Sequence, residues 1–439
     1  MGIFSTISEG FGSTISTGWY LFVHWYGWVL FVIAGFYIVR KLYQDKIMDD
    51  YVFSNKRIFL HIKIEKENLQ STLAVEQIFA SMHAMHQNFT WAERWLEGLV
   101  NLWWTAEMVS LGGKISFIIS VPEKVRGLAL SSFYAYYPNA EIAEVEDYMK
   151  NLTHLDDNSS WDIWGTEYKF TRDWAYPIRT WREFEHPAAE EPVIDPMAGV
   201  LEALSRAEPH EMLAIQIVMR PIADKDWAPH SEEVVQALKE EGDHHVPFLE
   251  RILPFLAWGS KKTVLEAIQK GGGQGAHGEE QKQPKVMRMT EGERNTVKGI
   301  ETKATKPAFQ TKIRHLYIAP KDKFDKNKKS LLVGAYRQFG AVNSNNLKPD
   351  VNGTWTNYNY AMFEALEKPF VKFMIMERKH LLLQGFVNRS RWIGIDPMIM
   401  NIEELATLYH FPLNTASTPP VERIDIKKGQ PPANLPVMS

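Results

Sequence analysis

Alternating apolar and polar positions are the most regular feature of this chain, and they predict β-strands with one buried face. Every second residue from Ile115 to Val121 is apolar, and Pro122, which has no N–H to donate, ends the ladder. Residues 123–136 change to helical spacing, and residues 141–145 return to a short strand. These elements cannot bury an apolar face alone, so the flanking sequence must supply more strands.

A second alternating stretch precedes this unit. Residues 57–65, RIFLHIKIE, predict a strand with one buried face. Ser71 precedes an apolar stripe with helical spacing, which is typical of a capped helix start. A tryptophan-rich insertion at 91–104 and a Gly-Gly turn at 112–113 lead into the next strand. Strand, helix, hairpin, helix and strand is the element order of a ferredoxin-like α/β sandwich, which we assign to residues 57–148.

The same order of elements recurs later in the chain. Residues 312–320, KIRHLYIAP, predict a strand that ends at a proline, and residues 323–339 predict a helix with a tyrosine near its end. We infer two copies of one α/β sandwich. The intervening sequence predicts a helix at 195–207, an apolar strand at 212–219 stopped by Pro221, an acidic helix at 231–240 and a low-complexity, disordered insertion at 259–298.

Residues 19–39 form an uncharged apolar run, WYLFVHWYGWVLFVIAGFYIV. A helix of about 21 residues spans a hydrocarbon core of about 30 Å, so the run predicts a transmembrane helix; the alternative is a buried core helix. The first basic residues follow the run, which places the N-terminus outside and the rest in the cytoplasm by the positive-inside rule. The expected membrane-anchoring residues are Trp19, Tyr20, Trp25, Trp28, Tyr37, Arg40 and Lys41.

These patterns together predict an α+β fold class, with one N-terminal transmembrane helix followed by two ferredoxin-like α/β sandwich repeats. The predicted domains are residues 1–46 for the N-terminal tail and transmembrane helix, 47–150 for the first sandwich, 151–415 for the second sandwich with its disordered insertion at about 259–298, and 416–439 for a proline-rich extended tail.

Composition narrows the class of protein. The chain has 439 residues, 45% of them hydrophobic, and can build two or three domains with cores. A formal net charge of −4 excludes a globally basic nucleic-acid binder. No cysteine occurs, which excludes disulfides, thiolate metal sites and cysteine nucleophiles. Without disulfides or a signal peptide, the bulk of the protein is expected in the cytoplasm.

The sequence contains no motif that we can assign to catalysis. A phosphate-binding loop needs glycines followed by Lys and Ser or Thr at fixed spacing, and the glycines at 271–278 do not have it. The pairs His83 with His86 and His244 with His245 have no third ligand at a suitable spacing. We therefore expect no catalytic, cofactor-binding or metal-binding residue, and a protein that is not an enzyme.

Residues 298–331 are the one pronounced charge feature, with ten Lys and Arg against three acidic residues. Such a stripe can follow a nucleic-acid backbone or anionic lipid. The alternative is a solvated face whose lysines protect a sheet edge. The candidate contact residues are Lys312, Arg314, Lys321, Lys323, Lys326, Lys328 and Lys329.

Three stretches are familiar together: ISFIISVPEKVRGLALSSFYAYYPNAEIAEVEDY at 115–148, HIKIEKENLQSTLAVEQIFASMHA at 61–84, and NIEELATLYHFP at 401–412 followed by PPANLP. They resemble the membrane-anchored N-terminal region of bacterial type IV secretion or conjugative DNA-transfer proteins, over nearly the whole chain after residue 46. In many relatives this region precedes a HerA/FtsK-like motor ATPase. The resemblance implies a single-pass inner-membrane protein, and it carries over no catalytic residue.

The leading hypothesis is a non-catalytic, inner-membrane-anchored component of a type IV secretion or conjugative DNA-transfer machine. Its cytoplasmic part would recruit or position a separate motor ATPase, and it could form a homo-oligomer. The alternative is a membrane-tethered nucleic-acid-binding module that uses the basic stripe at 298–331. A third hypothesis is a membrane-bound enzyme whose site the sequence does not reveal.

Overall fold

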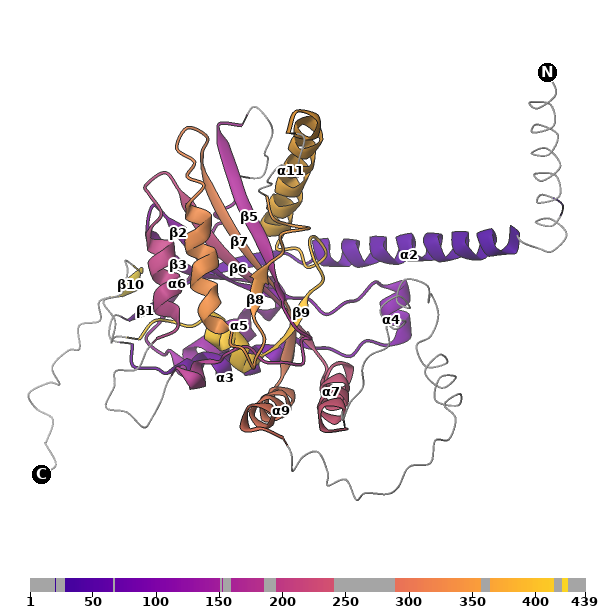
Figure 1. The fold of residues 1–439 in the computed structure, drawn as a ribbon, viewed down its shortest axis with the longest axis horizontal. Helices are drawn as coiled ribbons and strands as arrows, with labels where there is room; N and C mark the ends of the chain where they lie inside the picture. The colour runs from indigo at the N-terminus through magenta and orange to yellow at the C-terminus, as the bar shows by residue number, and fades with distance from the viewer. Residues whose placement is uncertain are drawn as a thin grey trace, which may run out of the picture.

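The alternating stretches lie side by side in one sheet (Figure 1). The computed structural model describes residues 20, 28–65, 68–150, 152, 159–184, 195–240, 289–356, 364–413 and 421–424. Within these residues ten strands join in the order β10-β1-β3-β2-β6-β7-β5-β8, with β4 beside β1 and β9 beside β7. The strands are β1 (Arg57–Glu65), β2 (Trp104–Leu111), β3 (Lys114–Pro122), β4 (Glu141–Val145), β5 (Trp161–Phe170), β6 (Met212–Ile222), β7 (Ala308–Pro320), β8 (Leu347–Pro349), β9 (Met398–Asn401) and β10 (Arg423–Ile424).

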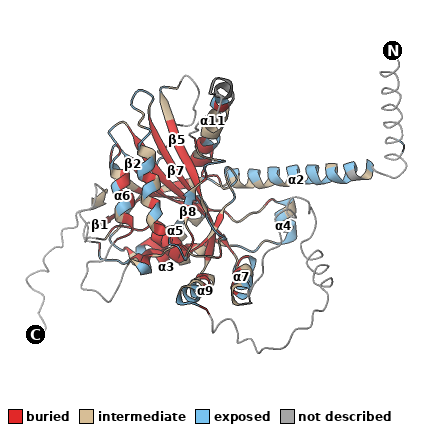
Figure 2. Ribbon diagram, in the orientation of Figure 1, coloured by how far each residue is buried: buried red, intermediate tan, exposed pale blue. Residues whose placement is uncertain are grey.

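Helices cover both faces of the sheet, so most of its strands are buried (Figure 2). The larger core lies under α3 (Thr72–Met82), α5 (Arg126–Tyr136), α6 (Met197–Ser205), α10 (Lys328–Ala335) and α12 (Ile402–Leu408). A smaller core lies under α11 (Glu364–Val387) on the opposite face. The other described helices are α2 (Trp28–Ser54), α4 (Trp91–Leu96), α7 (Ala228–Glu240) and α9 (Glu291–Ala304).

The period-2 pattern decides which side chain enters which core. On β3, Phe117 and Ile119 lie in the larger core, while Ile118 between them lies in the smaller core under α11. A shift of one residue in strand pairing would exchange the two sets. The register is therefore fixed by the sequence on both faces.

The sheet consists of two halves with the same strand order. One half is β4-β1-β3-β2 and the other is β8-β5-β7-β6, and they join where β2 pairs with the antiparallel β6. The strands at 114–121 and 312–320, now β3 and β7, occupy equivalent positions in the two halves. The two predicted sandwich repeats therefore share one continuous sheet instead of each having a sheet of its own.

The predicted transmembrane helix is also wrong. Among the described residues, no helix is both long and apolar enough to cross a membrane. Helix α2 has an uncharged stretch of only twelve residues, 28–39, followed by six charged residues between Arg40 and Asp50. The remaining part of the predicted span, residues 19 and 21–27, lies outside the described residues, and the anchoring residues Trp19 and Trp25 lie there too.

Two boundaries differ from the prediction for identifiable reasons. Strand β6 continues through Pro221, where it was expected to stop. Beyond Met219, β6 pairs only with β7, so one side of the strand makes no ladder bonds and the missing N–H costs little. The expected disordered insertion overlaps α9, in which Val297 is buried and Thr290 and Glu293 form a capping box. Residues 259–288 lie outside the described part.

Candidate interaction site formed by residues 385–395 and helix α2

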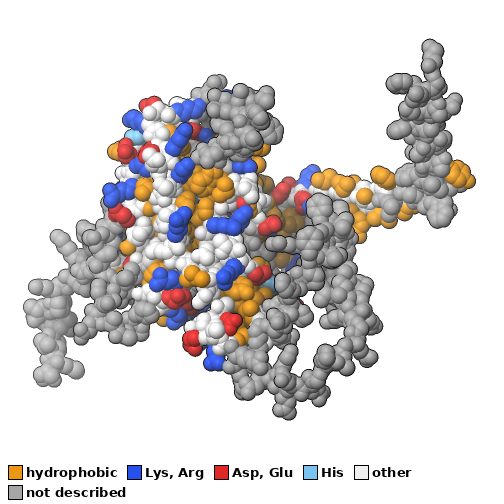
Figure 3. All heavy atoms as spheres, in the orientation of Figure 1, with side chains coloured by type: hydrophobic (Ala, Val, Ile, Leu, Met, Phe, Trp, Pro, Cys, Tyr) orange, Lys and Arg blue, Asp and Glu red, His pale blue; other side chains and the backbone are white. Residues whose placement is uncertain are grey.

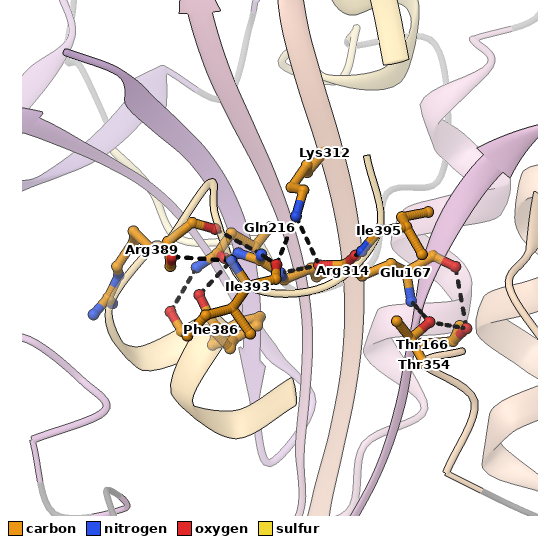
Figure 4. Close-up of polar contacts among 12 residues, drawn as sticks. Thr166, Glu167, Gln216, Lys312, Arg314, Thr354, Phe386, Arg389, Ile393 and Ile395 are labelled. Carbon is orange, nitrogen blue, oxygen red and sulfur yellow. Dashed lines mark hydrogen bonds and ion pairs between the residues drawn. The ribbon is translucent and has the colours of Figure 1, made fainter. Parts of the chain in front are cut away.

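A row of polar side chains crosses the sheet on the face that α11 covers (Figure 4). The residues in directly paired positions on β2, β6, β7 and β5 are Glu107, Gln216, Arg314 and Glu167. Gln216 Nε2 donates to Glu107 Oε1 at 2.9 Å, and Arg314 Nη1 donates to Gln216 Oε1 at 3.1 Å. All four side chains are buried, and burial of a charge is tolerated only where partners satisfy it.

The segment 385–395, which includes the end of α11, lies across this row and is held by two buried cations. The carbonyl oxygens that accept hydrogen bonds from the Arg314 guanidinium are those of Gly385 (2.8 Å), Ser390 (2.6 Å) and Ile393 (2.8 Å). Lys312 Nζ also donates to the Ile393 oxygen at 2.6 Å. Burial lowers the pKa of Lys312 to about 8, although Glu167 opposes this change. The path of the segment is thus set by buried charge.

Two residues of the segment have a left-handed backbone, Arg389 with φ +50° and Gly394 with φ +97°. The buried Arg389 side chain donates to Glu107 at 3.2 Å and to Asp147 at 2.7 Å. Burial would raise the pKa of Glu107, but the charge of Arg389 holds it below its usual value. A Cβ at position 394 would overlap the Glu167 carboxylate. Such backbone persists only where the surroundings determine it, and it is common at functional sites.

A cavity of about 540 Å³ separates this segment from α2. This volume is within the range of ligand-binding pockets. Its apolar lining consists of Met48, Val52 and Phe53 on α2, together with Trp103, Trp392 and Ile393. Trp103 is buried and its indole donates to the Arg389 carbonyl oxygen at 2.6 Å, whereas Trp392 is 44% exposed and meets the Trp103 ring edge to face at 6.2 Å. In the cavity lining, Trp103 is therefore held in place, and Trp392 is accessible to a partner.

The α2 side of the cavity carries acidic charge. Asp45 and Asp49 lie one helical turn apart and both line the cavity, as does Lys41. Neither aspartate has a hydrogen bond or an ion pair with any other residue that the structure describes. The pKa of Asp49 is raised by burial and by the neighbouring charges of Asp45 and Asp50. Together with Lys41, the two aspartates give the lining a formal charge of about −1, and negative charge near aromatic rings suits a cationic group.

The structure divides the seven candidate residues of the basic stripe. Lys312 and Arg314 are buried in the polar row, so neither can reach a nucleic acid. Lys328 is paired with Glu211 at 3.1 Å, and Lys329 lies 6.0 Å from the centre of the Trp355 ring. The three that are exposed are Lys321, Lys323 and Lys326.

The predicted anchoring residues that are described lie on or near α2, which extends away from the body of the protein (Figure 1). Figure 3 shows apolar side chains along the outer part of this helix and charged ones where it meets the body. Arg40 lies 5.6 Å from the Tyr37 ring and 4.3 Å from the Trp95 ring of α4. Tyr20, Trp28 and Lys41 are exposed.

The sequence strings that carry the family resemblance belong to the core. In ELATLYHFP, helix α12 is buried, and its Glu404 pairs with the buried Lys303 at 2.9 Å. Phe411 packs against Phe117 and against Tyr137, which precedes the Pro-Asn-Ala of the other string. These residues specify packing rather than a chemical site.

Sequence reasoning missed the polar row and the 385–395 segment. The signal for the polar row in the sequence was a single Glu or Gln inside an otherwise apolar strand, as in MLAIQIVM around Gln216. The two histidines noted at 83 and 86 have stacked rings 6.1 Å apart, and His83 Nε2 lies 3.0 Å from the Ile222 oxygen. In the described part of the chain, no three His, Asp or Glu side chains are placed to hold a metal ion.

Comparison with known proteins gives one result. A family model described as "Domain of unknown function (DUF8128)" matches residues 54–423, which include every described strand except the last residue of β10. No curated protein matches the sequence.

Proposed function

We propose, from the premise that the chain belongs to the DUF8128 family, that it is a non-catalytic component of a bacterial type IV secretion or conjugative DNA-transfer machine. In this role it positions a HerA/FtsK-like motor ATPase. The machine and the motor come from the resemblance of the 61–84, 115–148 and 401–412 strings to proteins of that machinery.

The observation that supports a docking role is the segment 385–395. Buried charges, a left-handed arginine and a glycine fix its backbone, yet its Trp392 remains accessible beside a large cavity. Rigid aromatic side chains at the edge of a pocket are typical centres of protein–protein binding energy. A surface whose backbone is already fixed before binding loses little conformational entropy when a partner binds.

The lining of the cavity defines the partner segment. Trp103, Trp392 and Ile393 favour apolar contact, and the exposed Asp45 and Asp49, without an ion pair among the described residues, favour positive charge. The occupant is therefore a segment of the motor in which an arginine or lysine stands next to apolar residues. Its cation would lie between the aspartates and the tryptophan rings, where both charge attraction and cation–π contact are available.

The nucleic-acid alternative is weaker in this geometry. Two of its seven candidate residues, Lys312 and Arg314, serve the polar row, and Lys328 is engaged with Glu211. The exposed Lys321, Lys323 and Lys326 would give a small phosphate-neutralising patch at most.

The test is co-purification of the tagged full chain from its native host, with partners identified by mass spectrometry. We expect a HerA/FtsK-like ATPase in the purified complex. The variants Trp392→Ala and Asp45→Asn/Asp49→Asn should each reduce its yield about tenfold, since a central interface residue contributes about 2 kcal/mol or more.

Two variants serve as matched controls. Asp50→Asn removes a charge from the same helical turn but outside the cavity lining, and Trp91→Ala removes an exposed tryptophan from α4. Both should retain the ATPase. A wild-type preparation without any such ATPase, or equal recovery from all variants, would refute the proposal.

A further inference from the structure

A second cavity, of about 330 Å³, lies between α2, α4 and the end of β6, and Met48 of α2 lines both cavities. Its lining is mainly polar. The cationic side chains among its lining residues are Arg94, Arg220 and Lys225, and the single carboxylate is Asp226. With His86 neutral, this lining carries a formal charge of about +2. This excess of positive charge around one cavity calls for an explanation.

Arg220 is the central feature of this cavity. It lies on β6, and its guanidinium has no hydrogen bond or ion pair with any residue that the structure describes. Its Nε is buried and has no hydrogen-bond partner in the part of the chain that the structure describes. Burial lowers the pKa of Arg220, and the charge of Arg94 lowers it further, while Asp226 opposes both. Buried donors without partners are rare in folded proteins, and an unobserved ion is one of their ordinary causes.

A second arginine increases the positive potential behind Arg220. Arg220 pairs across the strands with Gln310, and Arg391 Nη2 donates to the side chain of that Gln310 at 2.8 Å. The Nε of Arg391 is likewise buried without a partner. Burial lowers the pKa of Arg391 to about 9, and the charge of Arg220 contributes. Two arginines thus repel each other at this place, and no acidic residue is bonded to either one in the described part of the chain.

We infer that the cavity at Arg220 is a binding site for a phosphate group, with Arg220 and Arg94 as the principal ligands and Lys225 at its mouth. A guanidinium donates two parallel hydrogen bonds to phosphate oxygens, which is the bond that Arg220 lacks. A phosphate monoester carries a charge of about −1.5 to −2, which matches the charge of the lining. The site is distinct from the proposed motor-docking cavity and does not rest on that function.

The phosphate can come from a small soluble monoester or from a lipid headgroup. Helix α4, which carries Arg94, also exposes Trp91 (70%) and Leu96 (64%) outside the cavity lining. Apolar side chains next to a phosphate site are what a headgroup with its acyl chains would contact. The two sources share the phosphate chemistry, and they are separated by the form in which the phosphate is offered.

The experiment titrates the full chain with inorganic phosphate and with glycerol 3-phosphate by isothermal titration calorimetry. In parallel, the chain is sedimented with vesicles of phosphatidylcholine alone and of phosphatidylcholine mixed with phosphatidic acid. Arg220→Met and Arg94→Gln should each weaken phosphate binding about tenfold or more, because each removes charge-assisted hydrogen bonds to the phosphate oxygens. Arg337→Met, an exposed arginine on another element, is the matched control and should bind as the wild type does.

The outcomes separate cleanly. Soluble phosphate binding that depends on Arg220 and Arg94 supports the site with a small ligand. Sedimentation only with phosphatidic acid, lost in the same two variants, supports it with a lipid ligand. Absence of binding in both arms, or binding that the two variants leave unchanged, overturns the inference. Arg220→Met removes an unpaired charge, so its thermal midpoint should be at least that of the wild type, and this confirms that the variant is folded.

Discussion

Arg314 and Glu167 face each other directly across β7 and β5, and the Arg314 Nε donates to the Glu167 Oε1 at 2.7 Å. Both side chains are buried. The same arginine bonds three carbonyl oxygens of the 385–395 segment, and the same glutamate accepts the N–H of Ile395 at 2.6 Å. One ion pair therefore joins two strands and determines the path of a surface segment.

Removal of one partner of this pair should be costly. Arg314→Met leaves Lys312, at 3.9 Å, as the nearest described cation to the buried Glu167, and it removes the Arg314 donor from the Ser390 carbonyl oxygen. We expect the free energy of unfolding to fall by about 3–5 kcal/mol, measured by urea denaturation. Lys326→Met, at an exposed position, should change it by less than about 0.5 kcal/mol. A comparable loss of unfolding free energy in both variants would show that the buried ion pair does not stabilise the fold more than an exposed lysine does.

Glycine at 394 is required by its backbone and by its neighbour. Gly394→Ala places a Cβ at φ +97° against the Glu167 carboxylate, and should lower the free energy of unfolding by about 1–3 kcal/mol. Gly334→Ala, in α10, meets no atom within 4 Å and should instead raise it by about 0.4–1 kcal/mol. Thermal unfolding of the two variants in parallel measures the difference. A stabilising effect at 394 would contradict the strained geometry.

The buried His315 should make the protein sensitive to acid. Its ring lies between those of Tyr168 and Tyr336, with centroids 4.4 Å away on each side, and neither ring nitrogen has a hydrogen-bond partner among the described residues. Burial lowers its pKa from 6.5 to about 3. Between these values the unfolded chain binds a proton that the folded chain does not, so the free energy of unfolding falls as the pH falls.

His315→Phe should remove this part of the pH dependence. The stability of the variant relative to the wild type should rise by roughly 1.4 kcal/mol for each pH unit below about 6.5, as followed by urea denaturation at several pH values. Tyr168→Phe removes only a hydroxyl without a partner and should leave the pH slope unchanged. Parallel pH profiles for the wild type and His315→Phe would mean that the histidine titrates normally in the fold.

Within the predicted proline-rich extended tail at 416–439, residues 421–424 belong to the sheet. Strand β10 pairs with the parallel β1, Glu422 N donates to the Ile115 oxygen at 3.1 Å, and Glu422 pairs with Lys114 at 2.6 Å. A chain shortened after Leu413 should lose about 1–3 kcal/mol of unfolding free energy. A chain shortened after Ile424 retains β10 and should unfold like the full chain. Equal thermal midpoints for the two shortened chains would show that β10 does not stabilise the fold.

Local pattern carried most of the strand predictions. The bounds of β1 and β4 agree with the alternating stretches at 57–65 and 141–145, because each strand's own side chains determine its buried face. Helix α11 was missed, since its apolar residues are mixed with charged ones and Pro369 interrupts the sequence. Its buried face depends on the sheet strands beneath it. No local pattern specifies such a partner.

The site was less accessible from sequence than the fold. Lys312 and Arg314 were read as members of a surface stripe because ten basic residues cluster in 298–331. Their burial depends on Glu167, 147 positions before Arg314 in the chain, and on carbonyl oxygens of the 385–395 segment. Charge clustering along a sequence gives no information on which charges find partners in space.

The pairing of β2 with β6 has a consequence for any attempt to divide the chain. A fragment that covers only residues 47–150 would end its sheet at β2, whose eight residues would offer unpaired N–H and C=O groups along one side. Trp104, Ala106 and Met108 make one face of that strand apolar. Strands of other molecules can pair with such an edge, so the isolated half should aggregate or exchange strands with a second copy. In the intact chain, β2 and β6 pair with each other, so neither half exposes this edge.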